Sequence, residues 1–137
     1  MAFTGNYTCD VFKTGLLNGS FNFSSGSFYM ALYTNSATLD ADTTAYITTG
    51  EVVASGYTAG GALLAGAAVA ISDNVAYITF SNPVWTAALT ARGALIYKAG
   101  ANGAVCVLDF GSAKTSTATF TVQFPTASST SAIIRLS

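Results

Sequence analysis

Short apolar runs bounded by Gly, Asn, Ser or Thr recur along most of this chain at intervals of roughly 8–15 residues. Runs of this length and punctuation are typical of β-strands, and no helical pattern is interleaved between them. We therefore expect eight or nine strands in an all-β, antiparallel β-sandwich or jelly-roll-like fold. The expected strands cover 27–33, 75–80, 94–97, 104–110, 118–124 and 131–136, with one or two short strands within 44–53 and a weak strand in the later part of 52–72.

Two segments carry the strand pattern most clearly. Phe120, Val122 and Phe124 alternate with polar residues, so one face of this strand is expected to be buried and the other exposed. The runs 94–97 and 104–110 are separated by a segment rich in turn residues, Lys-Ala-Gly-Ala-Asn-Gly, which predicts a hairpin.

One helix is predicted, over residues 10–18. Apolar residues at 11, 12, 16 and 17 fit about two helical turns with one buried face, Asp10 is a suitable N-cap, and Asn18-Gly19 is a suitable end. No linker or change in composition divides the chain. We expect one β domain over 1–137, with an N-terminal arm and short helix at about 1–19 and a β core at about 27–137.

Charge is unusually scarce. Charged residues make up 8% of the chain and hydrophobic residues 51%, whereas a typical soluble domain has roughly 25% charged residues. Nineteen Thr and fourteen Ser supply most of the polarity, and Thr suits the outer face of a sheet. A surface with so little charge is poorly protected against association, so we expect much of it to be covered in an assembly.

The cations argue against a nucleic-acid partner, because they are scattered and phosphate binding needs several together. They are Lys13, Arg92, Lys98, Lys114 and Arg135.

A membrane partner is not expected either. Residues 52–72 carry no charge and are long enough to span a bilayer, but Gly, Ser, Thr and Ala dominate them. This segment is better interpreted as a Gly-rich loop at 56–61 followed by a weak strand. The N-terminus has no basic start and no apolar region typical of a signal peptide.

The chain contains no histidine, which removes the usual general base and the commonest metal ligand. Asp40 and Asp42 could pair as catalytic carboxylates or bind calcium, but a solvated turn is the simpler interpretation. Glu51, Asp73 and Asp109 are isolated in the sequence, and Asp109 is expected to face outward or to pair with Lys98 or Arg92. We expect no enzymatic activity, no catalytic residue, no cofactor and no metal site.

The two cysteines leave two alternatives open. Cys106 alternates with apolar residues and Cys9 lies beside the expected helix, which favours buried thiols. A Cys9–Cys106 disulfide is the alternative, which the sequence cannot decide.

Aromatic residues could pack in the core or form an interface. Tyr29, Tyr77 and Tyr97 lie inside strand runs and are expected in the core. Tyr57 and Trp85 lie in or beside loops, and they are our interface candidates.

Several segments resemble, in their order and spacing, a family of small virion structural proteins of tailed bacteriophages. The resemblance extends from about Phe12 to Arg135 and includes residues 12–19, 28–34, 50–52, 56–61, 90–97, 107–111, 120–125 and 132–135. The chain departs from the family in carrying alanine around 62–70, where members often have polar or charged residues. This departure argues against a charge-based contact there.

The resemblance implies a virion protein assembled in the cytoplasm of a bacterial host. It favours a capsid decoration (cement) protein that binds the major capsid protein and forms homo-oligomers, with a trimer favoured. A tail, neck or fibre-associated subunit, including a receptor-binding one, is the alternative. A cement protein needs no reaction, because its repeated contacts across capsomer boundaries must all be broken before the shell comes apart.

Overall fold

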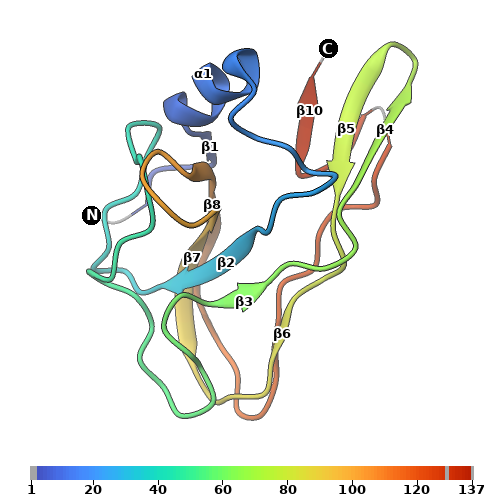
Figure 1. Cartoon of the computed structure of the whole chain (residues 1–137). Helices are drawn as coiled ribbons and strands as arrows, with labels where there is room; N and C mark the ends of the chain where they lie inside the picture. The colour runs from blue at the N-terminus through green and yellow to red at the C-terminus, as the bar shows by residue number, and fades with distance from the viewer. Residues whose placement is uncertain (1–2, 129, 137) are drawn as a thin grey trace.

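Two long strands, β7 (Thr90–Tyr97) and β8 (Ala104–Thr115), pair antiparallel in the middle of a five-stranded sheet. This computed structural model describes residues 3–128 and 130–136. The sheet order is β1-β8-β7-β2-β3, in which β2 (Tyr29–Tyr33) is flanked on both sides. The edge strands β1 (Tyr7–Thr8) and β3 (Ala62–Leu63) contain two residues each. We refer to this sheet, the helix and the loops packed against them as the body (Figure 1).

The predicted hairpin between β7 and β8 is confirmed. The backbone N–H of Lys98 donates to the carbonyl oxygen of Gly103 at 2.8 Å, which closes the turn. Asn102 adopts a φ of 58°, in the left-handed region that Asn tolerates better than most residues. Both strands extend beyond the apolar runs that predicted them, because backbone pairing continues where the side chains become polar.

The helix α1 (Asp10–Asn18) has the predicted bounds, but its N-cap is Cys9 rather than Asp10. Its buried side is centred on Phe12 and Gly15, where a Cβ would lie 2.4 Å from the Phe21 ring. Glycine is therefore required for this close approach. Leu17, expected on the buried face, is 92% exposed, because it projects away from the side that packs against Phe21.

A second sheet, which we call the wing, has the order β10-β5-β4. It contains β4 (Ala68–Ser72), β5 (Val75–Thr79) and β10 (Ile134–Leu136), all antiparallel. Asp73 and Asn74 join β4 to β5 with φ angles of 53° and 65°, as in the tight turns that suit hairpins. The wing projects beside α1 and away from the five-stranded sheet (Figure 1).

A third, two-stranded sheet pairs β6 (Val84–Trp85) with β9 (Phe120–Thr121). The expected strand at 118–124 is thus paired over two residues only, although Phe120, Val122 and Phe124 are all buried as their alternation predicted. Within 44–53 the structure has no strand, and a single bridge joins Glu51 to Tyr33 of β2.

All three sheets contribute to one connected apolar core, so the antiparallel, sandwich-like, all-β fold with one short helix is confirmed. Phe80, directly after β5, joins the wing to the body. Its ring centroid lies 6.1–6.4 Å from those of Phe23, Phe28 and Phe124.

Residues 52–72 form loops together with β3 and β4, as expected for a Gly-rich loop followed by a weak strand. Gly61, with a φ of 82°, lies so close to β2 that a Cβ would be 1.8 Å from the Met30 carbonyl oxygen. Among the described residues, no helix is both long and apolar enough to cross a bilayer.

Candidate functional site

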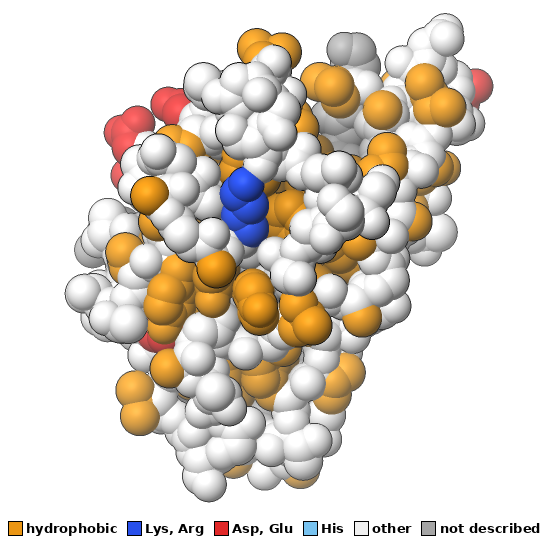
Figure 2. All heavy atoms as spheres, in the orientation of Figure 1, with side chains coloured by type: hydrophobic (Ala, Val, Ile, Leu, Met, Phe, Trp, Pro, Cys, Tyr) orange, Lys and Arg blue, Asp and Glu red, His pale blue; other side chains and the backbone are white. Residues whose placement is uncertain are grey.

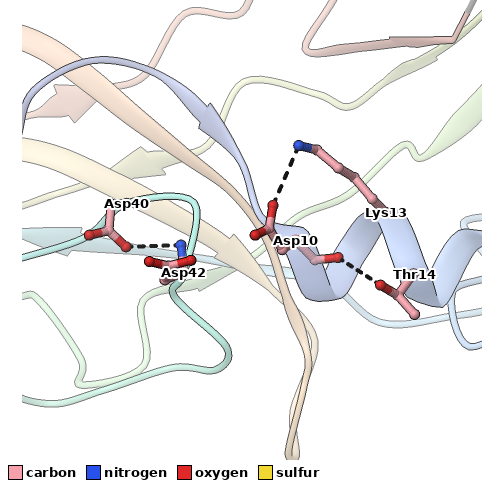
Figure 3. A network of polar contacts seen from close by, with 5 residues as sticks. All are labelled: Asp10, Lys13, Thr14, Asp40 and Asp42. Atoms are coloured by element: carbon pink, nitrogen blue, oxygen red, sulfur yellow. Dashed lines mark hydrogen bonds and ion pairs between the residues drawn. The ribbon is translucent and has the colours of Figure 1, made fainter.

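The Asp40–Asp42 loop is an Asx turn. The Asp42 backbone N–H donates to Asp40 Oδ1 at 2.9 Å, and Figure 3 shows this carboxylate turned toward its own loop. Asp10, at the start of α1, instead faces Lys13 of the same helix at 3.5 Å. In the described part of the chain, no three His, Cys, Asp or Glu residues are grouped as metal ligands. The geometry therefore matches the turn interpretation of this loop.

Tyr57 and Trp85 do not lie at a surface, which corrects their assignment as interface candidates. Both side chains are buried, and their ring centroids are 6.3 Å apart. The prediction relied on the position of these residues in or beside loops. The loop that carries Tyr57 folds back onto β2, where Tyr57 Oη accepts a hydrogen bond from the Leu32 N–H at 2.9 Å. Trp85 packs edge-on against Phe120 across the two-stranded sheet.

Glu51, isolated in the sequence, is the acceptor at the centre of a buried polar network that the sequence did not predict. Tyr46 Oη donates to Oε1 at 2.5 Å, Tyr57 Oη donates to Oε2 at 2.6 Å, and the Gly60 N–H donates to Oε2 at 2.8 Å. Tyr97 Oη donates to the neighbouring Gly60 carbonyl oxygen at 2.6 Å. Tyr46 and Tyr57 flank Glu51 in sequence, which is the one signal that could have suggested this network.

The tyrosines in and beside this network have raised pKa values. Burial raises the pKa of Tyr33, Tyr46 and Tyr57 well above 10.0, and hydrogen bonding to Glu51 adds to the shift for Tyr46 and Tyr57. Burial, with a smaller contribution from the charge of Glu51, raises the pKa of Tyr97 to about 12. The raised pKa values extend the pH range over which these hydroxyls donate, and the network pins the loop that contains Tyr46 to Gly60 onto the body.

Cys9 and Cys106 are free, buried thiols, which resolves the alternative that the sequence left open. Burial, reinforced by the charge of Asp10, raises the pKa of Cys9 to about 12. Burial raises the pKa of Cys106 further. A thiol reacts as its thiolate, so neither cysteine is placed to act as a nucleophile at neutral pH.

Asp109 pairs with Arg92 across β7 and β8, as one of the sequence alternatives predicted, and both side chains are largely buried. The guanidinium carbon of Arg92 also lies 5.6 Å from the centroid of the Phe3 ring. Lys98 donates to the Ser20 carbonyl oxygen and covers the Phe21 ring. Asp109, Arg92 and Lys98 thus connect elements of the body, and fewer charged side chains remain for contacts at the surface.

The wing presents the feature that most needs an explanation. Antiparallel register places Val69 opposite Ile78 and Ile78 opposite Ile134, and the next row on the same face is Ile71, Ala76 and Leu136. This face therefore contains six apolar side chains and no polar one. Ile78 and Ile134 are buried against the body, whereas Val69, Ile71 and Leu136 are 56%, 73% and 63% exposed.

A groove of about 450 Å³ separates this face from the body. Leu16, Phe21 and Phe23 line it from the body, opposite Val69, Ile134 and Leu136 of the wing. Figure 2 shows apolar side chains at the surface along the wing, with few charged atoms on this side of the molecule. Such a surface can bind a complementary apolar surface.

No protein-family model, no curated protein and no solved structure matches this chain.

Proposed function

We propose that this chain is a non-enzymatic structural subunit of a bacteriophage virion, and more specifically a capsid decoration protein. The structural role rests on one observation. The wing exposes a continuous aliphatic face that contains no charged residue. The location in a virion is supported by the family resemblance from about Phe12 to Arg135. In this role, the chain binds copies of itself and the major capsid protein.

The scarcity of surface charge supports an assembled state. Eleven charged side chains share 6993 Å² of accessible surface, or one for about 640 Å². Glu51 is buried and the Arg92–Asp109 pair is largely so, which removes three of them from the surface. Charge repulsion that would keep copies apart is therefore weak.

The kind of exposed side chain favours a protein partner over a sugar. The large hydrophobic residues that are exposed in the described part of the chain are all aliphatic: Leu17, Ile47, Val53, Leu63, Val69, Ile71, Val84 and Leu136. A sugar platform needs an exposed aromatic ring, and the two best candidates, Tyr57 and Trp85, are buried. Aliphatic patches of this kind are typical of contacts between proteins.

A decoration protein of this type stabilises a shell by binding the assembled state and not the dissociated subunits. The contribution of each copy is small, but symmetry repeats it many times over the particle. The rigid body holds the wing in a fixed position through Phe80 and its aromatic neighbours. No chemical step is required.

Copy number in purified particles tests the proposal. A decoration protein is expected at hundreds of copies per virion by quantitative mass spectrometry, and particles without it should lose resistance to heat. A count of six to eighteen copies would exclude decoration and favour the tail, neck or fibre role. Absence from the particle would contradict both roles.

A further inference from the structure

The edges of the sheets differ in how well they are protected against pairing with another chain. In the described structure, the edge strands β1, β3, β6 and β9 contain two residues each, and such short edges offer little to a partner. The three residues of β10 border a groove whose other side is formed by Phe12, Lys13 and Leu16 of α1. β8 extends past β1 as a longer edge, but this part contains Lys114 and a Gly111 in the left-handed region (φ 84°), which hinder edge pairing. β4 has five residues, lies at an edge and has neither feature.

β4 has none of the usual features that prevent edge pairing. All five residues, Ala-Val-Ala-Ile-Ser, are exposed although they alternate between the two faces, so the strand is open on both sides and along its edge. It contains no Lys, no Pro and no charged residue of any kind. Protected edges in natural proteins use such residues, or bulges, to block a further strand.

We propose that β4 pairs antiparallel with β4 of a second copy about a two-fold axis at Ala70, which joins two wings into one six-stranded sheet. This inference rests on the self-association proposed above and names the surface that carries it. The two-fold joins two copies, so it replaces the trimer favoured from the sequence.

The length of β4 favours this register, because Ala70 is the middle residue of Ala68–Ser72 and a two-fold axis there pairs all five residues. With Ala70 on the axis, Ala70 faces its own copy, and Val69 faces Ile71 of the second copy. Val69 and Ile71 already lie on the same face of each wing. The apolar rows of one wing therefore continue into the other without a change of face.

The absence of charge on β4 favours a second copy of the same strand as its partner. An uncharged strand is matched by another uncharged strand, whereas an acidic or basic partner would bury its charges against it without compensation. Asp73 follows β4 directly, and antiparallel pairing places the two copies of it about 20 Å apart, beyond the screening length of about 8 Å. A parallel pair would bring them side by side.

The size of the contact predicts its strength. A stable interface buries about 800 Å² of accessible surface on each partner, which is about a ninth of the 6993 Å² of accessible surface of this chain. A pair of five-residue strands is only about 17 Å long, which places this contact at the small end of specific interfaces. We expect dissociation constants on the order of micromolar for the free chain, which repetition in an assembly would strengthen.

Disulfide trapping tests the register. In Ala70→Cys the two introduced cysteines would face each other within the Cα separation of about 4.4–6.8 Å that a disulfide needs. In the control Ala68→Cys, on the same strand, they would be about 14 Å apart. We expect at least tenfold more disulfide-linked dimer from Ala70→Cys under mild oxidation. Cys9 and Cys106 are buried and will not compete.

A second pair of variants tests the strand without a disulfide. Ile71→Lys should weaken self-association at least tenfold by light scattering, because it places a like charge in both copies of the edge. Val53→Lys, at a position 97% exposed and outside the wing, should leave association unchanged. Circular dichroism of both variants checks that the fold is retained.

The outcomes separate this inference from the proposed function. Self-association that survives Ile71→Lys, or equal trapping of Ala68→Cys and Ala70→Cys, would overturn the β4 pair and leave a structural subunit. A stable trimer would also overturn it, as would a disulfide between the Ala70→Cys variant and a different virion protein in assembled particles. A wild-type chain that stays monomeric at millimolar concentration would contradict self-association itself.

Discussion

The apolar run of β7 and the strand β4 are similar in composition and opposite in environment. Residues 94–96 of β7 read Ala-Leu-Ile and are completely buried, while β4 reads Ala-Val-Ala-Ile-Ser and is exposed throughout. β7 has a neighbour on each side and core on its faces, whereas β4 is the edge of the wing. Apolar composition favours a strand but does not decide what covers it.

The two regions also differ in how they are fixed. The body contains the Glu51 network, the Arg92–Asp109 pair and most of the core. The wing is fixed at its base by Ile78, Phe80 and Ile134, and its tip has no comparable support. The body therefore provides stability, and the wing is available for contacts with other molecules.

Alkaline pH should have the largest effect, because it acts on buried groups of the body. Cysteine and tyrosine ionise near 9.0 and 10.0 in the unfolded chain, whereas the pKa values of Cys9 and Tyr97 are raised to about 12 in the fold. A raised pKa stabilises the fold fully below the unfolded value, and this contribution is lost as the pH rises through the folded value.

Stability should thus be constant up to about pH 9 and fall between about pH 9 and 12, with complete unfolding at the upper end. Circular dichroism measures the loss of the fold over this pH range, and tyrosinate absorbance measures the ionisation of the tyrosines. Tyrosines that all titrate near pH 10 without loss of the fold would contradict the buried network.

Matched isoleucine truncations should give the next largest effect. Ile96→Ala in β7 should lower the free energy of unfolding by about 2–5 kcal/mol, because it leaves a cavity in the core. Ile71→Ala in β4 should change it by no more than about 0.5 kcal/mol, since that side chain is 73% exposed. Urea denaturation of both variants measures the difference, and equal losses would show that the wing is part of the cooperative core.

Glu51→Gln should lower the free energy of unfolding by an intermediate amount, about 1–3 kcal/mol. The amide nitrogen of Gln would face one of the buried groups that now donate a hydrogen bond to the Glu51 carboxylate. The control Asp42→Asn removes an exposed carboxylate and should be neutral within about 0.5 kcal/mol. Thermal and denaturant unfolding measure both. Comparable stability of the two variants would argue that the network does not fix the loop.

The smallest effect should be seen in amide hydrogen exchange of the native chain. In dilute solution, amides of β4 should exchange faster than those of β7, because an exposed edge opens locally without unfolding the core. Raising the protein concentration should slow exchange in β4 alone if copies pair there. Protection of β4 that equals that of β7 in dilute solution would remove the distinction between body and wing.

Local patterns predicted local structure well. The bounds of α1 and the turn between β7 and β8 depend on residues within a few positions of one another, such as Asn18-Gly19 and Asn102-Gly103. The alternation of Phe120, Val122 and Phe124 likewise predicted which side chains are buried. It did not predict that pairing stops after Thr121, because pairing depends on where a partner strand ends.

The candidate site could not be predicted in the same way. Tyr57 and Trp85 were assigned to a surface from their positions in loops, and both are buried because distant segments fold over them. Glu51 was isolated in sequence but accepts from Tyr46, Tyr57 and Gly60. Neither result could be derived without knowing which loops meet.

The all-β class, the short helix, the scarcity of charge and the lack of a histidine-based site follow from the sequence alone. These properties depend on composition and on the periods of side chains along the chain, which any fold must respect. The tertiary structure alone decided which apolar strands are covered. Burial is set by the neighbours that a strand acquires through contacts far apart in sequence, and for that reason β7 forms the core while β4 faces outward.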